Sequence, residues 1–81
     1  MKYRKKPVIV EAWQNVESDP TPPWVSKISV RQPNGWRKVF IPFYAWSIAE
    51  PNDWIIRDSN GAVTVCKPDV FAETYEPVEE Q

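Results

Sequence analysis

The stretch DWIIRDSNGAVTVC, residues 53–66, carries the clearest structural pattern in the chain. Two runs rich in β-branched residues flank Asn60-Gly61, a dipeptide that supplies the positive φ values needed by a tight hairpin turn. The stretch therefore predicts a β-hairpin. Its second strand alternates, with Ala62, Thr64 and Cys66 on one side and Val63 and Val65 on the other.

A second hairpin is predicted upstream, over residues 27–41, around Pro33-Asn34-Gly35. Its return strand also alternates. Trp36, Lys38 and Phe40 share one side, and Arg37, Val39 and Ile41 share the other. Both sides mix apolar and basic residues, so the pattern leaves open which side is buried.

The segments before and between the hairpins are shorter and more interrupted. PVIVEAW, residues 7–13, predicts a strand, and residues 42–52 predict either a bulged strand or a connection packed on the core. Residues 15–23 predict a loop. A helical turn over residues 24–27 is expected to follow it, with Thr21 as the cap.

The C-terminal part predicts one short helix, over residues 69–76. Asp69 is placed as its N-cap, and Pro77 ends it. One face of this helix is expected to carry Val70, Phe71, Thr74 and Tyr75. Residues 77–81 are acidic and are expected to fray.

Length and proline content place the chain among small α+β domains. Its 81 residues suffice for one domain, expected over residues 1–76, and nine Pro keep every element short. We expect a strand-rich fold, either a small antiparallel sheet or a partly open barrel of four to five strands, with one short C-terminal helix.

Aromatic residues are abundant, with five Trp, three Tyr and three Phe. Large rings help a small chain to build a core, because each buries roughly 150–250 Å². Exposed aromatic residues are also common anchors of protein interfaces. Either role fits these residues, and the candidates for an outward position are Trp24, Trp36, Trp46 and Trp54.

The residues needed for most catalytic and metal sites are missing. The chain has no His and a single cysteine, so it offers no Ser-His or Cys-His pair, no structural zinc site and no internal disulfide. Both of its Gly residues lie in predicted hairpin turns, which leaves no phosphate-binding loop. We therefore expect no catalytic residue, no metal and no cofactor.

Two acidic residues and the cysteine have competing interpretations. Asp53 and Asp69 are candidates for a carboxylate pair, but simpler roles are to close a turn after Pro51-Asn52 and to cap the helix. Cys66 is either a buried apolar residue or a thiol activated by Lys67.

Charge is unevenly distributed although the net charge is only −1. Residues 1–40 carry a net charge of +5 and residues 41–81 a net charge of −6. The two ends either neutralise each other across the fold or attract a charged partner. The basic N-terminus contains only three consecutive apolar residues, so we expect a cytoplasmic protein without a signal peptide, a membrane span or a membrane partner.

Basic residues near aromatic rings suggest single-stranded nucleic acid as an alternative ligand. A groove for such a ligand combines Lys and Arg for the phosphate backbone with rings for base stacking. The candidates are Lys2, Arg4, Lys5, Lys6, Arg31, Arg37 and Lys38. The sequence pI of about 5.3 argues against this alternative, because nucleic-acid-binding domains are usually basic.

Residues 1–14 and 51–76 carry a resemblance to a known family. MKYRKKPVIVEAWQ and DWIIRDSNGAVTVCKPDVFAETYE resemble a group of small phage and prophage proteins whose last part follows the pattern GDWIIRG-x-x-GE-x-x-x-CKPDIFE-x-TYE. Asn52 replaces the usual Gly before Asp53, and Asn tolerates the same positive φ. The residues shared with the pattern include Asp53, Trp54, Cys66, Lys67, Pro68, Asp69, Phe71 and Tyr75.

The resemblance implies a phage or prophage origin and a compact strand-rich domain, without a particular activity. We expect an accessory protein in the host cytoplasm that binds a host or phage protein without catalysis, as in host takeover or counter-defence. The alternatives are a single-stranded nucleic-acid binder, a minor virion component and a binder of a small signalling nucleotide. The candidate binding residues are Trp36, Arg37, Trp54, Arg57, Lys67, Asp69 and Tyr75, among which Arg57, Lys67 and Asp69 are the polar groups of one hypothetical surface site.

Overall fold

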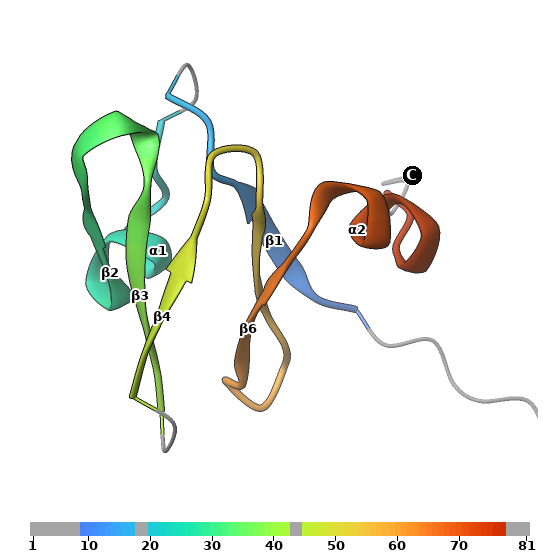
Figure 1. Cartoon of the computed structure of the whole chain (residues 1–81). Coiled ribbons are helices and arrows are strands. Elements are labelled where there is room, and N and C mark those ends of the chain that lie inside the picture. Colours follow the sequence, from blue (N-terminus) through green and yellow to red (C-terminus); the bar gives the residue numbers. More distant parts are fainter. Residues whose placement is uncertain (1–8, 18–19, 43–44, 78–81) are drawn as a thin grey trace, which may run out of the picture.

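The computed structural model describes residues 9–17, 20–42 and 45–77, which form two small sheets and two short helices (Figure 1). The strands are β1 (Glu11–Gln14), β2 (Ser29–Arg31), β3 (Arg37–Ile41), β4 (Ala45–Ala49), β5 (Trp54–Arg57) and β6 (Val63–Cys66). The α-helices are α1 (Pro23–Ile28) and α2 (Pro68–Thr74), and a 3-10 turn covers Pro33–Gly35.

The strands divide into two antiparallel sheets, ordered β1-β5-β6 and β2-β3-β4. The expected α+β, strand-rich class is confirmed, with six strands in the described residues rather than four or five. One of the additional strands is β4, which pairs with β3 along its whole length and selects the strand interpretation of residues 42–52. The strands do not close into a barrel.

Both predicted Asn-Gly hairpins are present, but the first begins at Ser29 rather than at residue 27, because residues 27 and 28 continue α1. In the β5-β6 hairpin, Gly61 has a φ of 84°, and Asp58 Oδ1 accepts hydrogen bonds from the backbone N–H groups of Asn60 and Ala62. In the β2-β3 hairpin, Asn34 and Gly35 have φ values of 64° and 79°. These are the positive values that an Asn-Gly turn supplies at low cost.

The β2-β3-β4 sheet also decides which side of the alternating β3 is buried. Arg37 and Val39 point inward, whereas Lys38 and Phe40 are exposed. The buried side meets the rest of the core through Val39, which is fully buried. The opposite side of the sheet, which carries Lys38 and Phe40, is therefore exposed to solvent.

The first strand begins later than predicted. Residues 9 and 10 are not in a strand, and β1 begins at Glu11, because its pairing partner Arg57 is the last residue of β5. The chain beyond Arg57 enters the hairpin turn and offers no further partner. The start of the prediction, at Pro7, lies outside the described residues.

Both helices begin without the predicted side-chain caps. The N-cap of α1 is Pro22 rather than Thr21, and the N-cap of α2 is Lys67 rather than Asp69. In each helix a Pro occupies the first turn, where its fixed φ favours helix entry and its missing N–H costs nothing. The start of α2 is thus displaced toward the N-terminus, and Asp69 lies inside the first turn.

One core cluster joins the two sheets and α1. It consists of Trp13, Val25, Val39, Ala49, Ile55 and Val63, with Trp24, Ile28, Ile41 and Val65 packed against it. The two sheets contribute the fully buried residues Ile55, Val39 and Ala49, and α1 contributes Val25. The apolar interior is therefore shared, so neither sheet has a separate core.

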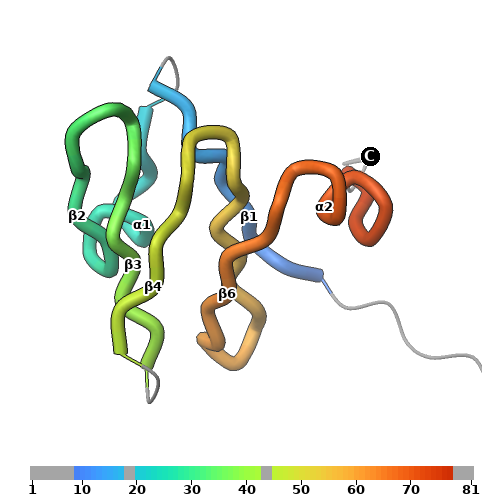
Figure 2. Tube along the Cα trace, viewed as in Figure 1, coloured from blue at the N-terminus to red at the C-terminus, as the bar shows by residue number. Residues whose placement is uncertain are grey.

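Helix α2 stands beside the β1-β5-β6 sheet, on the side away from β2-β3-β4 (Figures 1 and 2). Its contact with the sheet is aromatic, because the Phe71 ring stacks on Trp54 with centroids 3.9 Å apart. Tyr75 continues the stack at 5.0 Å from Phe71. The predicted four-residue face is only half correct, because Val70 and Thr74 are exposed. Residues 78–81 of the expected frayed tail lie outside the described residues.

Candidate binding surfaces

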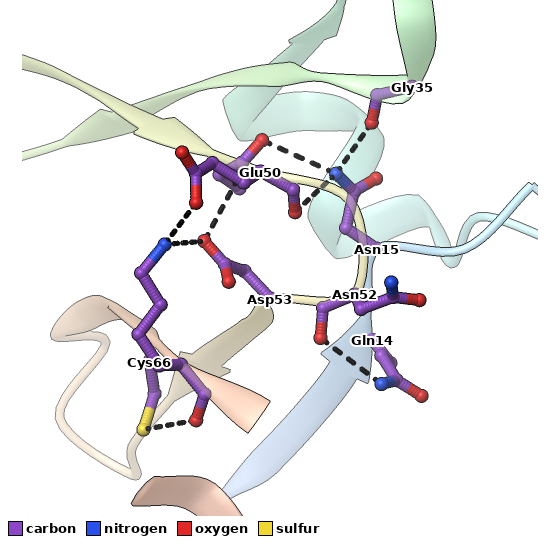
Figure 3. A network of polar contacts seen from close by, with 9 residues as sticks. Gln14, Asn15, Gly35, Glu50, Asn52, Asp53 and Cys66 are labelled. Carbon is purple, nitrogen blue, oxygen red and sulfur yellow. Dashed lines mark hydrogen bonds and ion pairs between the residues drawn. The ribbon is translucent and has the colours of Figure 1, made fainter. Parts of the chain in front are cut away.

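The connection between β4 and β5 is a tight polar turn that links the two sheets (Figure 3). Asn52 has a φ of 76°, and the backbone N–H of Asp53 donates to the carbonyl of Glu50 over 3.0 Å. Asp53 Oδ2 accepts the backbone N–H of Glu50 at 2.9 Å. The predicted role of Asp53 in closing this turn is confirmed, as is the tolerance of Asn52 for a positive φ.

Asn15 fastens the same turn to the end of β1 (Figure 3). Its side-chain N–H groups donate to the carbonyls of Gly35, Glu50 and Ala49 at 2.9, 3.2 and 3.4 Å. Its backbone also exchanges hydrogen bonds with Asp53 and Asn52. Asn15 is 6% exposed, and its buried amide satisfies backbone carbonyls of the β2-β3-β4 side, while its backbone bonds to the residues that lead into β5.

Lys67 completes this network from the end of β6. Its Nζ lies 3.1 Å from Asp53 Oδ2 and also pairs with Glu50 Oε2. The hydrogen bonds to Glu50 and Asp53 raise the pKa of Lys67. Because the Asp53 side chain is only 3% exposed, a cationic partner is what makes its burial tolerable. We interpret this cluster as structural.

Cys66 does not have the environment of an activated thiol. Burial, followed by the negative charges of Asp69 and Asp53, raises the pKa of the Cys66 thiol. The neighbouring Lys67 ammonium is held by two carboxylates instead. Since the thiolate is the reactive form, the hypothesis of a thiol activated by Lys67 is wrong.

A large apolar surface lies on the exposed side of the β2-β3-β4 sheet. The pairing of Val30 with Lys38, Lys38 with Ile48, and Phe40 with Trp46 places these side chains on one side. Trp36 precedes β3 in extended backbone, so the same alternation adds it to them. We call this surface the outer face; it consists of Val30, Trp36, Lys38, Phe40, Trp46 and Ile48.

The outer face has a defined internal arrangement. Phe40 and Trp46 meet edge to face, with ring centroids 5.5 Å apart, and are 42% and 53% exposed. The Lys38 ammonium lies 5.6 Å from the centroid of Trp46. With Trp36, which is 39% exposed, the face offers three exposed rings, a residue type enriched in protein interfaces, and one cation beside them.

The structure brings together only some of the predicted binding residues. Trp54 and Tyr75 belong to the aromatic stack around Phe71, and Lys67 lies nearby at the end of β6. Asp69 is exposed in the first turn of α2. These residues surround one end of the β5-β6 hairpin.

Other predicted binding residues lie elsewhere. Arg57 is at the opposite end of the hairpin, where it pairs with Glu11 at 2.9 Å and lies over the Trp24 ring. It therefore does not join Lys67 in one polar site. Arg37 is buried beneath the β2-β3-β4 sheet, and Trp36 lies on the outer face.

The three described residues of the set proposed for nucleic-acid binding, Arg31, Arg37 and Lys38, do not gather on one surface. Lys2, Arg4, Lys5 and Lys6 lie outside the described residues. Arg31 is paired with Glu17 at 2.7 Å, and Arg37 is buried on the side opposite Lys38. Lys38 is thus the one member of this set on the outer face.

Sequence reasoning missed several members of the outer face. Trp46 was a candidate for an outward position, but Val30 and Ile48 were not singled out, because isolated β-branched residues in strands are usually buried. Their positions follow only from the cross-strand register. Asn15 was missed because an Asn before a proline-rich segment resembles an ordinary loop residue.

Other kinds of site find no support in the described part of the chain. None of its helices has the length and apolar character needed to cross a membrane. Across residues 9–17, 20–42 and 45–77, no three His, Cys, Asp or Glu side chains gather where they might hold a metal ion. Comparison with protein-family models, curated proteins and solved structures gives no match to this chain. Function is therefore inferred from the arrangement of its own residues.

Proposed function

We propose that this protein is a non-catalytic binding module that docks a protein partner on the outer face. One observation carries the proposal. Of the seven large apolar residues exposed in the described part of the chain, five belong to the outer face, namely Val30, Trp36, Phe40, Trp46 and Ile48. A contiguous apolar surface of this kind marks an interaction site more often than scattered exposed residues do.

The distribution of charge favours a protein over single-stranded nucleic acid. A nucleic-acid groove needs several cations along the phosphate backbone. On the outer face Lys38 is the only charged residue, and it already lies over the Trp46 ring where a base would stack. The aliphatic residues Val30 and Ile48 are better suited to an apolar protein surface.

The chemistry of the face indicates the chemistry of its partner. The partner should present apolar side chains toward Phe40 and Trp46, and a carboxylate toward Lys38. Burial of the rings would supply most of the free energy, and the charge pair would mainly fix orientation. The resemblance to phage and prophage proteins motivates the further proposal that this partner is a host or phage protein in the host cytoplasm.

The test is capture of proteins from host lysate by wild-type and substituted protein, followed by calorimetry with the captured partner. Trp46→Ser and Phe40→Ser should each weaken binding at least tenfold, which corresponds to about 1.4 kcal/mol. Val70→Ser is the matched control, because Val70 is also exposed but lies on α2. Lys38→Glu should weaken binding, whereas Lys27→Glu on α1 should not.

Three results would contradict the proposal. The first is the absence of a stoichiometric partner, and the second is a partner lost equally with Val70→Ser. The third is oligonucleotide binding that weakens with salt and with neutralisation of Lys5, Lys6 and Arg37, which would favour the nucleic-acid alternative. Mass spectrometry of purified particles would identify a virion component instead.

A further inference from the structure

Arg37 is a buried cation that makes only two hydrogen bonds to the side chains of the part of the chain that the structure describes. The residue is 8% exposed, and its guanidinium lies 5.2 Å from the centroid of the Trp13 ring. Nη1 donates to Ser29 Oγ at 3.0 Å, Nη2 reaches Thr21 Oγ1 only at 3.5 Å, and Nε has no partner among the described residues. A guanidinium has five N–H donors and stays charged at physiological pH.

Within residues 9–17, 20–42 and 45–77, no opposite charge compensates Arg37. No carboxylate of the described residues lies within ion-pair distance of Arg37. Burial, together with the neighbouring charge of Arg31, lowers the pKa of Arg37. A buried charge without a partner is costly. An anion that binds beside Arg37 would offset this cost, so its binding should be favourable.

A second arginine lies at the same place. Arg31 faces Arg37 across the β2-β3 pairing, and both line a narrow cavity of about 40 Å³ together with Asn15, Val16, Glu17, Thr21 and Gly35. Glu17 pairs with Arg31, but both side chains are more than 60% exposed. Such an exposed pair contributes little stability, and an incoming anion can replace it.

A wider depression adjoins the cavity, with which it shares lining residues. This depression has a volume of about 480 Å³ and shares Asn15, Val16, Glu17 and Gly35 with the cavity. Asn34, Pro51 and Asn52 form the rest of its wall. Its size falls within the range of about 300–1,000 Å³ that is usual for small-molecule sites.

We infer that the cavity between Arg31 and Arg37 binds the oxyanion headgroup of a small molecule, a phosphate or a carboxylate, whose remaining part lies in the depression. The planar donor fork of arginine matches both headgroups in a bidentate way. The site lies under the β2-β3-β4 sheet and is independent of the outer face, so either can fail without the other.

Calorimetry with inorganic phosphate, acetate, adenosine monophosphate and adenosine tests this inference. Arg31→Gln should weaken anion binding about tenfold, because it removes the charged hydrogen-bond donors of one of the two guanidinium groups. Glu17→Gln should strengthen binding several-fold, because it removes the competing carboxylate. Arg57→Gln and Glu11→Gln change the comparable exposed pair outside the cavity and should leave binding unchanged. Arg37→Lys keeps the charge but removes the fork, and should weaken binding in a protein whose unfolding midpoint shows that it is folded.

Different outcomes identify the headgroup, test the role of the depression and test the site as a whole. Tighter binding of phosphate than of acetate identifies a phosphate ligand, and the reverse order identifies a carboxylate. Adenosine monophosphate that binds no tighter than phosphate would overturn the role of the depression. Failure of both anions to bind the Glu17→Gln protein, or equal losses in Arg31→Gln and Arg57→Gln, would overturn the site.

Discussion

On the β1-β5-β6 sheet, the outward-facing Trp54 ring is covered by the chain itself, because Phe71 of α2 stacks on it. On the β2-β3-β4 sheet, no described element covers Phe40 and Trp46, and both rings are exposed. The two sheets share one core but differ in what happens on the side turned away from it. The short chain uses its C-terminal helix on one sheet, and the outer face of the other is open to a partner.

The shared core should produce the largest effect of any single substitution. Ile55→Ala removes a fully buried side chain from the cluster that joins both sheets. We expect it to lower the free energy of unfolding by about 2–5 kcal/mol, measured by urea denaturation. Ile48→Ala on the outer face is the control, with a change of about 0.5 kcal/mol or less. Two separate unfolding transitions would show that the sheets do not share a core.

The difference between the covered and open sides can be measured directly with two aromatic substitutions. Phe71→Ala uncovers Trp54 and should cost about 1–3 kcal/mol, less than the loss of a fully buried ring. Trp46→Ala should cost less than about 1 kcal/mol, because its ring is already exposed. Equal losses of unfolding free energy in the two variants, by thermal or urea denaturation, would show that the two rings contribute equally to stability.

The turn that joins the sheets should have a smaller effect. Asn52 has a φ of 76°, and Ala tolerates this conformation poorly. Asn52→Ala should therefore cost about 1 kcal/mol. Asn52→Gly should be close to neutral, since Gly accepts a positive φ. A loss with Gly as large as with Ala, judged from urea midpoints, would mean that the Asn52 side chain rather than its backbone is needed.

Lys67 links the same turn to β6 and should have the smallest effect, which is present at neutral pH and is lost at alkaline pH. Its folded-state pKa is raised by Glu50 and Asp53, so its protonated form is stabilised by folding. This contribution is complete below the pKa of an unfolded Lys, about 10.4, and is lost as pH rises through the higher folded value.

The measurement compares urea denaturation of wild type and Lys67→Met across this range. The stability difference between them should stay constant up to about pH 10 and then shrink. Lys27→Met, which removes a Lys without an ion pair among the described residues, should show no such change. A difference that persists at high pH would show that Lys67 acts through packing.

Much of the fold was predictable from local signals. Asn34 and Gly35, and later Gly61, take the positive φ values that define both hairpins. The start of β1 was not predictable, because it depends on where β5 ends at Arg57, a residue far away in the sequence. Helix starts were displaced because a Pro in the first turn outweighed the side chains of Thr21 and Asp69.

The candidate surfaces were less predictable than the fold. Alternation in β3 separated Lys38 from Arg37 correctly, but neither side was apolar enough to show which was buried. The outer face appears only when β4 is placed beside β3, which pairs Trp46 with Phe40. The cavity between Arg31 and Arg37 likewise depends on a cross-strand pairing, and Asn15 reaches it from a different sheet.

The position of β1 has a consequence for the synthesis of the chain. Gln14 pairs with Trp54, and Glu11 pairs with Arg57, so the first strand has no partner until Trp54, 40 residues beyond its own end at Gln14, has been made. The β2-β3-β4 strands, in contrast, follow one another directly and can pair as they emerge. Long loops close slowly and at an entropic cost, so we expect β1 to dock last. Trp13, one of the largest side chains of the folded core, is therefore expected to stay exposed to solvent until β5 has been translated.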